Sequence, residues 1–187
     1  MDLTEHSISS RTVYQGGLLH VKKDEVRLPD GETSGREWIT HPGASAIVPV
    51  DAEGQVVLVR QFRFPAGREF WEVPAGKLDA RGEDPLVAAR RELAEEVQLT
   101  AERWTRLGTT YPAIGYSDEV IHLFLAEGLQ PSDETTDDDE FVEPFRIPLE
   151  RAVEMARRGE IQDGKSCVAL LVAAAALAER DAGPSSS

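Results

Sequence analysis

Runs of hydrophobic and polar residues along the chain predict short strands and three helices. Runs that alternate in polarity or are wholly apolar, and that end at Gly, Pro or Asp, are typical of strands. The expected strands span residues 10–14, 18–21, 24–28, 36–40, 44–50, 55–61, 104–110 and 120–126. The runs at 44–50 and 55–61 are almost continuously apolar, which indicates strands covered on both faces.

The strongest helical pattern begins at Asp84. Aspartate is a favourable N-cap, and Pro85 suits the first helical position because its missing N–H would have no partner there. Leu86, Leu93 and Val97 are spaced so that they share one face. We therefore predict an amphipathic helix with this face in the core.

Two further helices are expected near the end of the chain. The first spans residues 149–158 and is closed by Gly159. The second is rich in alanine and spans residues 166–180. It is expected to pack by the side that carries Val168, Leu171 and Val172.

A length of 187 residues fits one domain with a sizeable core. The strands of residues 1–40 could form a small antiparallel sheet apart from the main fold. Residues 41–182 are expected to form the main domain. The Gly-Pro-Ser-Ser-Ser stretch at 183–187 is expected to be a disordered tail.

The charge balance argues against nucleic acid and membrane partners. Lys and Arg number 20 against 34 Asp and Glu, giving a net charge of −14, which an anionic duplex or bilayer would repel. Phosphate compounds remain possible substrates if metal ions and a few arginines bind them. Cys167 is the single cysteine, and the N-terminus shows no secretory pattern. We therefore expect a cytoplasmic protein.

The predicted helix that follows Asp84 also carries the candidate chemistry. Glu92, Glu95 and Glu96 share one face, where like charges repel each other. Such a cluster is either well solvated or neutralised by a cation. Carboxylate oxygens suit Mg²⁺ or Mn²⁺, and Glu83 could add another ligand. An ordinary solvated helix face is the alternative for so short a motif.

Residues 76–99 resemble the Nudix box. Gly76 is followed by six residues, Glu83, seven more residues, and then the sequence RELAEEVQL from Arg91 to Leu99. The family pattern has five residues in the first gap, so we expect a wider turn and an intact metal helix. Gln98 stands where the family usually has a glycine, which puts the end of the helix in question.

Other segments resemble the ADP-ribose pyrophosphatase branch of this family. They are REW at 36–38, QFR at 61–63, WEVPAG at 71–76, SDE at 117–119 and EFVE at 140–143. The resemblance implies an α/β (α+β) fold, the Nudix αβα sandwich with a mixed central sheet, plus a small N-terminal antiparallel sheet. In this branch the N-terminal sheet is often exchanged or shared with a partner subunit, so the resemblance also implies a homodimer with a composite site, to which residues 1–40 would contribute.

The same resemblance assigns metal and catalytic roles. The implied metal ligands are the Ala75 carbonyl and the carboxylates of Glu92, Glu95, Glu96 and Glu140. Glu140 would complete the metal site or orient the attacking water, with Asp138 and Asp139 as alternatives. Arg91 would position a box carboxylate by a salt bridge.

It also implies a set of substrate contacts. Trp38 would help to hold the adenine together with the neighbouring Arg36, although half-buried packing is the simpler interpretation of Trp38. Arg63 would contact the diphosphate, although it could also be a surface charge at a strand end. Glu72 would lie near substrate or metal, and Glu119 would touch the terminal ribose.

The function implied by the resemblance is Mg²⁺-dependent hydrolysis, with Mn²⁺ possible, of the pyrophosphate bond of ADP-ribose. The products would be AMP and ribose 5-phosphate. GDP-mannose or another nucleoside diphosphate sugar is an alternative substrate. A non-catalytic ligand sensor would be expected to lack box carboxylates or to carry a DNA-binding segment, and the sequence shows neither feature. An acidic scaffold protein would not be stabilised by Mg²⁺.

Overall fold

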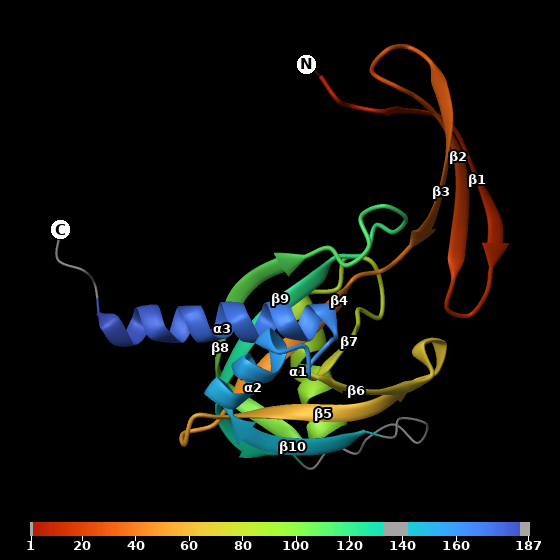
Figure 1. Ribbon diagram of the computed structural model, residues 1–187. Coiled ribbons are helices and arrows are strands. Elements are labelled where there is room, and N and C mark those ends of the chain that lie inside the picture. Colours follow the sequence, from red (N-terminus) through yellow and green to blue (C-terminus); the bar gives the residue numbers. More distant parts are fainter. Residues whose placement is uncertain (1, 133–141, 184–187) are drawn as a thin grey trace. The chain divides into compact units, whose positions relative to one another are not determined.

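The computed structural model describes residues 2–132 and 142–183 (Figure 1). Contacts between Cα atoms group the chain into two units. An N-terminal unit consists of Met1–Pro42 and Tyr111–Val120, and a larger unit consists of Gly43–Thr110 and Ile121–Ser187.

The N-terminal unit is built on a three-stranded antiparallel sheet in the order β1-β2-β3. Its strands are β1 (His6–Gln15), β2 (His20–Arg27) and β3 (Thr33–Thr40). The two short strands predicted at 18–21 and 24–28 are wrong, because β2 is one continuous strand. It pairs along its length with both neighbours, and this pairing carries the strand through the polar Lys22 and Lys23.

The loop after residue 110 completes this unit. The Ile39 N–H donates to the Tyr116 carbonyl over 2.8 Å. The His41 N–H donates to the Asp118 carboxylate over 2.7 Å. The sequence predicts this segment as a loop, and these bonds hold it against the end of β3.

The larger unit holds a mixed sheet of seven strands. They are β4 (Ala44–Val50), β5 (Gln55–Arg63), β6 (Arg68–Glu72), β7 (Ala75–Lys77), β8 (Leu99–Thr110), β9 (Ile121–Pro131) and β10 (Glu143–Pro148). The main path runs β10-β5-β4-β9-β8, with β6 beside β5 and β7 beside β4. Strands β4 and β9 are parallel, and the other pairs are antiparallel.

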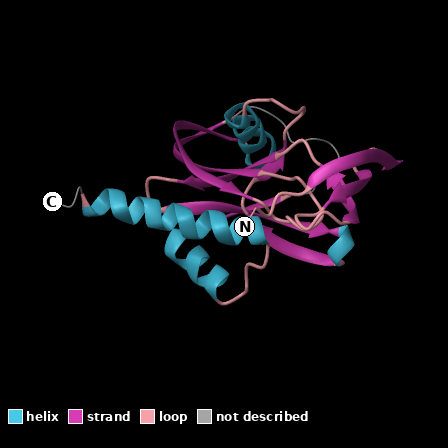
Figure 2. Cartoon of the chain, turned by 90° about the horizontal axis from the view of Figure 1, so that it is seen from above, coloured by secondary structure: helices cyan, strands magenta, loops and turns pink. Residues whose placement is uncertain are grey.

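Helices cover both faces of this sheet (Figure 2). They are α1 (Pro85–Val97), α2 (Leu149–Arg157) and α3 (Gly164–Ala182). Ile47 and Val57 face α1, whereas Val48 and Leu58 belong to the core under α2 and α3. Neighbouring strand residues point to opposite faces, so the apolar runs supply both cores. The predicted αβα sandwich is confirmed.

Three of these strands lie outside the expected set. Strand β10 carries Pro144 and Pro148, which lower its strand propensity, and it lies at one end of the main path, where proline is tolerated. Strands β6 and β7 are short and follow a 3-10 turn at Phe64–Ala66. Pairing with longer strands stabilises them: β6 pairs with β5, and β7 pairs with β4.

The packing side predicted for the last helix is wrong. Val168 and Leu171 are 38% and 44% exposed. The buried apolar face of α3 consists of Ala169, Leu170 and Ala173. Alanine is buried about as readily as larger apolar residues, so the size of a side chain does not identify the core face of an alanine-rich helix.

Helix α1 begins as predicted and ends with a left-handed residue. Asp84 accepts a hydrogen bond from the Leu86 N–H over 2.9 Å, and Pro85 occupies the first turn. Gln98 adopts φ 56° and ψ 42°, and its N–H donates to the Ala94 carbonyl over 3.0 Å. The turn that glycine usually makes is therefore made here by glutamine.

Candidate active site

Helix α1 and the short strand β7 bring buried carboxylates against a backbone segment. Glu92 and Glu96 are only 7% and 5% exposed, whereas Glu95 is less buried. A Cβ atom added to Gly76 would lie 2.0 Å from Oε1 of Glu92. The Ala75 N–H donates to Oε2 of Glu96 over 2.9 Å. The absence of a side chain at Gly76 therefore permits the close approach of the Glu92 carboxylate.

Arg91 links the carboxylates to this strand. Its Nη1 donates to Glu92 over 2.7 Å and to Glu95 over 3.1 Å, and its Nη2 donates to the Lys77 carbonyl over 3.0 Å. Burial alone lowers the pKa of Arg91, but the charge of Glu92 and the hydrogen bond to Glu95 outweigh it and raise the pKa. The guanidinium therefore stays charged and holds two carboxylates in place.

The oxygen atoms of this site suit a hard divalent cation. Carboxylates and backbone carbonyls are the ligands that Mg²⁺ and Mn²⁺ prefer. Over residues 2–132 and 142–183, no three His, Cys, Asp or Glu side chains are gathered closely enough to hold an ion. In this arrangement Arg91 bridges Glu92 and Glu95, so holding an ion requires the glutamates to shift toward one another. The donor types fit a metal, and the carboxylates already lie on one helix face.

A second cluster surrounds the buried Glu72, which is 2% exposed. Arg63 donates to its two carboxylate oxygens over 2.7 and 2.6 Å. Lys165 also donates to Glu72, and it contacts Asp163 over 2.9 Å. Glu96 acts electrostatically on Arg63 and raises its pKa further. The charge of Arg63 thus interacts both with Glu72 and with Glu96 of helix α1.

The pKa of Glu72 shows whether burial or the neighbouring cations have the larger effect on this carboxyl group. Burial raises the pKa of this carboxyl group, but the hydrogen bonds from Arg63 and the charge of Lys165 outweigh burial and lower it below its ordinary value of 4.5. The hydrogen bond to Glu72 correspondingly raises the pKa of Arg63. Glu72 is therefore ionised at neutral pH although it is buried.

Sequence reasoning missed Lys165, which α3 places in this cluster. Asp163 caps the helix by accepting the Ser166 N–H over 3.0 Å, and Ser166 Oγ accepts the Val73 N–H over 2.8 Å. Lys165 is the only charged residue between Gly164 and Ala178. A cation in the first turn of a helix opposes the helix dipole, so this position was a signal for a carboxylate partner.

The remaining predicted substrate residues lie in the N-terminal unit. Nε of Arg36 donates to Glu5 over 2.9 Å. Nε1 of Trp38 donates to Asp24 over 2.8 Å. Glu119 lies 3.8 Å from Nδ1 of His41. Their predicted contacts with substrate stay predictions. Glu140 and its alternatives, Asp138 and Asp139, lie outside the described residues.

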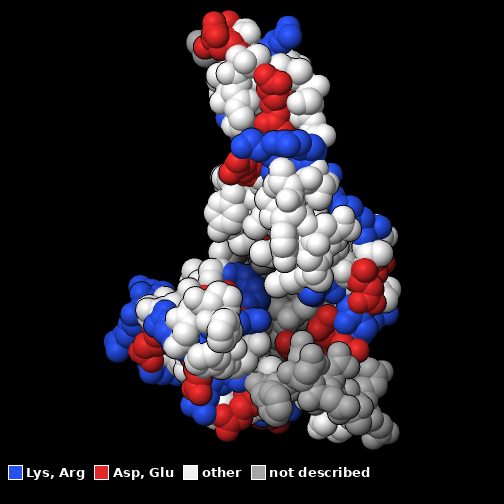
Figure 3. All heavy atoms as spheres, turned by 90° about the vertical axis from the view of Figure 1, so that its right-hand side faces the viewer, with Lys and Arg blue, Asp and Glu red and all other residues white. Residues whose placement is uncertain are grey.

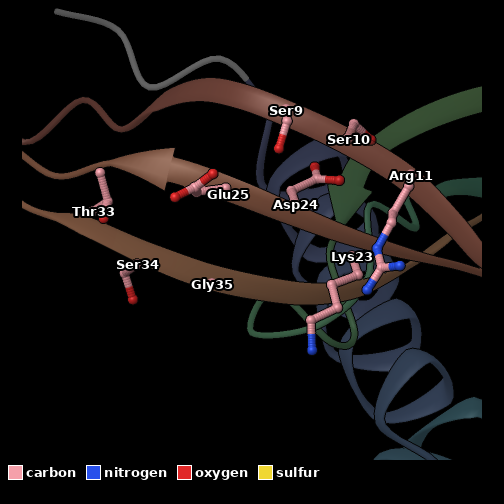
Figure 4. Close-up of a pocket in the computed structure, with 9 residues that line it drawn as sticks. All are labelled: Ser9, Ser10, Arg11, Lys23, Asp24, Glu25, Thr33, Ser34 and Gly35. Atoms are coloured by element: carbon pink, nitrogen blue, oxygen red, sulfur yellow. The ribbon is translucent and has the colours of Figure 1, made fainter.

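The N-terminal sheet carries a polar hollow of about 450 Å³ (Figure 4). Hydroxyl and charged groups of all three strands line it, namely Ser9, Ser10, Arg11, Lys23, Asp24, Glu25, Thr33 and Ser34, together with Gly35. Arg11 and Lys23 lie opposite each other in the strand register. The two carboxylates balance these two cations, so the hollow is not a strong anion site. None of the predicted site residues lines it.

The absence of a nucleic acid partner stays a prediction, and the charges on the visible surface are mixed in sign (Figure 3). On the face shown in Figure 3, Lys and Arg lie interspersed with Asp and Glu. The whole chain has a net charge of −14. No helix within the described part of the chain is long and apolar enough to cross a membrane.

Two family models match the chain. Residues 39–167 match the NUDIX domain, and residues 5–39 match the nucleoside diphosphate sugar hydrolase N-terminal domain. A solved structure described as an ADP compounds hydrolase superposes with a TM-score of 0.83. It covers 98% of each chain at 22% identity, which supports the fold.

Relatives match over most of their length. An ADP-ribose pyrophosphatase of Bacillus subtilis is 39% identical and covers 90% of this chain and 91% of its own. One of Mycobacterium tuberculosis is also 39% identical and covers 85% of this chain and 79% of its own. A methanol dehydrogenase activator of Bacillus methanolicus is 37% identical, with 89% and 90% covered. The chain therefore belongs to the Nudix hydrolase family.

Proposed function

We propose that this chain is a Mg²⁺-dependent pyrophosphatase that hydrolyses ADP-ribose, or a related nucleoside diphosphate sugar, at the α1 carboxylates. The observation that carries the proposal is the packing of Glu92 and Glu96 against the backbone of Ala75 and Gly76. Burying two carboxylates costs folding free energy, and metal binding is a function that offsets such a cost. An ordinary solvated helix face would not need this contact.

Each residue then has a distinct task. Glu92, Glu95 and Glu96, with the Ala75 carbonyl, would hold the metal, while Arg91 keeps two of these carboxylates oriented. When bound, divalent ions neutralise the diphosphate and lower the pKa of a water molecule. Arg63 would bind the diphosphate through its guanidinium, which matches phosphate oxygens in a bidentate manner.

The reaction consumes one water molecule and breaks one P–O bond. Water attacks a phosphorus atom of ADP-ribose, the bridging oxygen leaves with the other phosphate, and AMP and ribose 5-phosphate result. Glu140 is proposed to orient or deprotonate the water. Asp138 and Asp139 are the alternatives for this role, and all three residues lie outside the described residues.

The relatives' names support the choice of substrate. Two of them are named ADP-ribose pyrophosphatases, and each is 39% identical to this chain. The sequence segments REW, QFR and WEVPAG point to the same branch. Oxygen ligands suit both ions, so we propose Mg²⁺ as the metal with Mn²⁺ as the alternative.

We further propose a homodimer in which the N-terminal sheet meets a second copy. Strand β1 is exposed along its length, and large apolar residues of β1 and the turn after it reach the surface. They are Ile8, Val13, Tyr14, Leu18 and Leu19. A small sheet with apolar residues on its surface is stabilised when another surface covers them. A cytoplasmic location is proposed from the single cysteine.

A substrate panel tests the proposed activity. Phosphate-ester release would be measured with ADP-ribose, ADP-glucose, GDP-mannose, NADH, diadenosine polyphosphates and dGTP, each with Mg²⁺ or EDTA. We expect rapid cleavage of ADP-ribose that requires Mg²⁺. Cleavage of GDP-mannose alone would keep the chemistry and overturn the assigned substrate. Binding of ADP-ribose without cleavage of any compound would favour a ligand sensor.

A further inference from the structure

Two cations share one buried carboxylate beside the proposed metal site. Oε2 of Glu72 accepts hydrogen bonds from both Arg63 and Lys165. The two cations differ in exposure: the side chain of Arg63 is 45% exposed, whereas that of Lys165 is 13% exposed. Lys165 is therefore the enclosed partner of Glu72, and Arg63 is the partner that reaches solvent.

The cluster around Glu72 holds two cations and two carboxylates, since Lys165 also contacts Asp163, and Arg63 is the cation that is open to a ligand. Arg63 lies at the end of β5, directly before the 3-10 turn, and it interacts electrostatically with Glu96. Glu72 accepts from Nε and from one N–H of Nη2, so it does not use the N–H groups of Nη1 and the second N–H of Nη2, which could bind a diphosphate. A diphosphate bound at this edge would share with Glu72 the positive charge of Arg63.

Sharing the charge of Arg63 with a diphosphate is costly unless Glu72 keeps another partner. A buried carboxylate left without a counter-ion costs several kcal/mol in general. Lys165 fits the task because the first turn of α3 fixes it in place. Asp163 contacts Lys165 and caps the helix, and Ser166 ties the same turn to Val73.

We infer that Lys165 is a positioning residue that neutralises Glu72 and so frees Arg63 to bind the diphosphate of the substrate. The inference rests on the proposed function, since it assumes a diphosphate ligand. It adds to the proposed substrate site a residue, Lys165, that does not itself contact the substrate. Lys165 acts through Glu72, so its effect on binding must depend on the charge of Glu72.

The test compares Lys165→Met in two backgrounds, wild type and Glu72→Gln. The dissociation constant of ADP-ribose is measured by calorimetry in EDTA, where no turnover is expected, and KM and kcat are measured with Mg²⁺. Alone, Lys165→Met should raise the dissociation constant and KM roughly 10- to 100-fold, as for loss of one partner of a buried charge pair. The kcat should change less than about threefold, since saturating substrate still engages Arg63.

In the Glu72→Gln background the same substitution should change the dissociation constant less than about threefold, because no buried charge remains to be neutralised. Lys165→Arg should restore most of the binding. Arg151→Met is the matched control, because it removes the cation of an exposed salt bridge to Glu160 on the same unit. It should leave binding and turnover unchanged. Thermal melts of all variants show whether they fold.

Three results would overturn the inference. The first is an unchanged dissociation constant in Lys165→Met. The second is an equal rise in both backgrounds, which would give Lys165 a role independent of Glu72. The third is wild-type protein that neither binds ADP-ribose in EDTA nor cleaves it with Mg²⁺, which would remove the proposed substrate as well. Wild-type binding that depends on Lys165 without hydrolysis would instead contradict only the proposed catalysis.

Discussion

Gly76 shows how one missing side chain shapes the candidate site. Its Cα faces the carboxylate of Glu92, and an added Cβ would overlap both carboxylate oxygens and the carbon between them. The overlapping group is the end of a flexible side chain, so Glu92 can move away. The cost of a substitution would therefore fall on the position of Glu92 more than on the fold.

Gly76→Ala should lower kcat for ADP-ribose by about 100-fold, since a displacement of about 1 Å in a catalytic group has effects of this size. The melting temperature should fall only slightly. Kinetics and a thermal melt on the same sample measure both. Gly17→Ala is the control, because nothing lies within 4 Å of a Cβ at that position. Normal kcat in Gly76→Ala would show that the contact with Glu92 does not matter for catalysis.

Glu72 should contribute to stability in a pH-dependent manner. Its pKa is lowered in the folded protein because its two cations outweigh burial. A lowered pKa stabilises the fold above the ordinary value of 4.5, and this contribution is lost as pH falls through the folded value. The free energy of unfolding of wild type should therefore exceed that of Glu72→Gln at pH 7, and the difference should shrink below pH 4.5. Urea unfolding at several pH values measures it. A difference that does not change with pH would contradict this account.

At the scale of elements, α1 and the two central strands could be predicted from sequence. Apolar spacing and the Asp84-Pro85 start define the helix, and the continuous runs at 44–50 and 55–61 define strands whose two faces are both buried. Strand β10 could not be predicted, because its prolines are tolerated only through its place at the end of the strand path. Local pattern contains no information about which edge of the sheet stays open.

The candidate site likewise has residues that could be placed from sequence and residues that could not. Glu92, Glu95 and Glu96 could be placed on one face from helical spacing alone. The Glu72 cluster could not, because Lys165 is 93 residues away in sequence and meets Glu72 only through the packing of α3. The contact of Gly76 with Glu92 likewise depends on β7 pairing with β4. Tertiary contacts of this kind leave no periodic signal.

The end of α1 offers a prediction about stability. Gln98 has a positive φ of 56°, which costs a residue with a side chain about 1–2 kcal/mol, whereas glycine adopts it freely but loses more entropy on folding. Gln98→Gly should therefore stabilise the protein by about 0.5–1 kcal/mol, which raises the melting temperature by about 1–4 °C. Calorimetry measures the shift. Gln98→Ala keeps the strained backbone and should give no gain, so an equal gain in both variants would rule out backbone strain as the cause.

At the scale of the whole molecule, the proposed dimer can be tested by mass. Light scattering should give about twice the 20.5 kDa of one chain. Ile8→Asp should shift the protein toward monomer, because it places a charge on the exposed apolar strand β1. Leu171→Asp is the matched control, since Ile8 is 45% exposed and Leu171 is 44% exposed. A wild-type monomer at micromolar concentration would contradict the dimer.

The central claim is that the α1 carboxylates hold the metal that hydrolysis requires. The most direct test is the rate of ADP-ribose cleavage as Mg²⁺ is titrated, in wild type, in Glu96→Gln and in Glu179→Gln, an exposed glutamate near the end of α3. Wild type and Glu179→Gln should show the same saturable dependence on Mg²⁺. Glu96→Gln should need far more Mg²⁺ and lose most of its maximal rate, because a neutral amide replaces a carboxylate ligand. Equal Mg²⁺ dependence in all three proteins, or full wild-type activity in EDTA, would contradict the assignment.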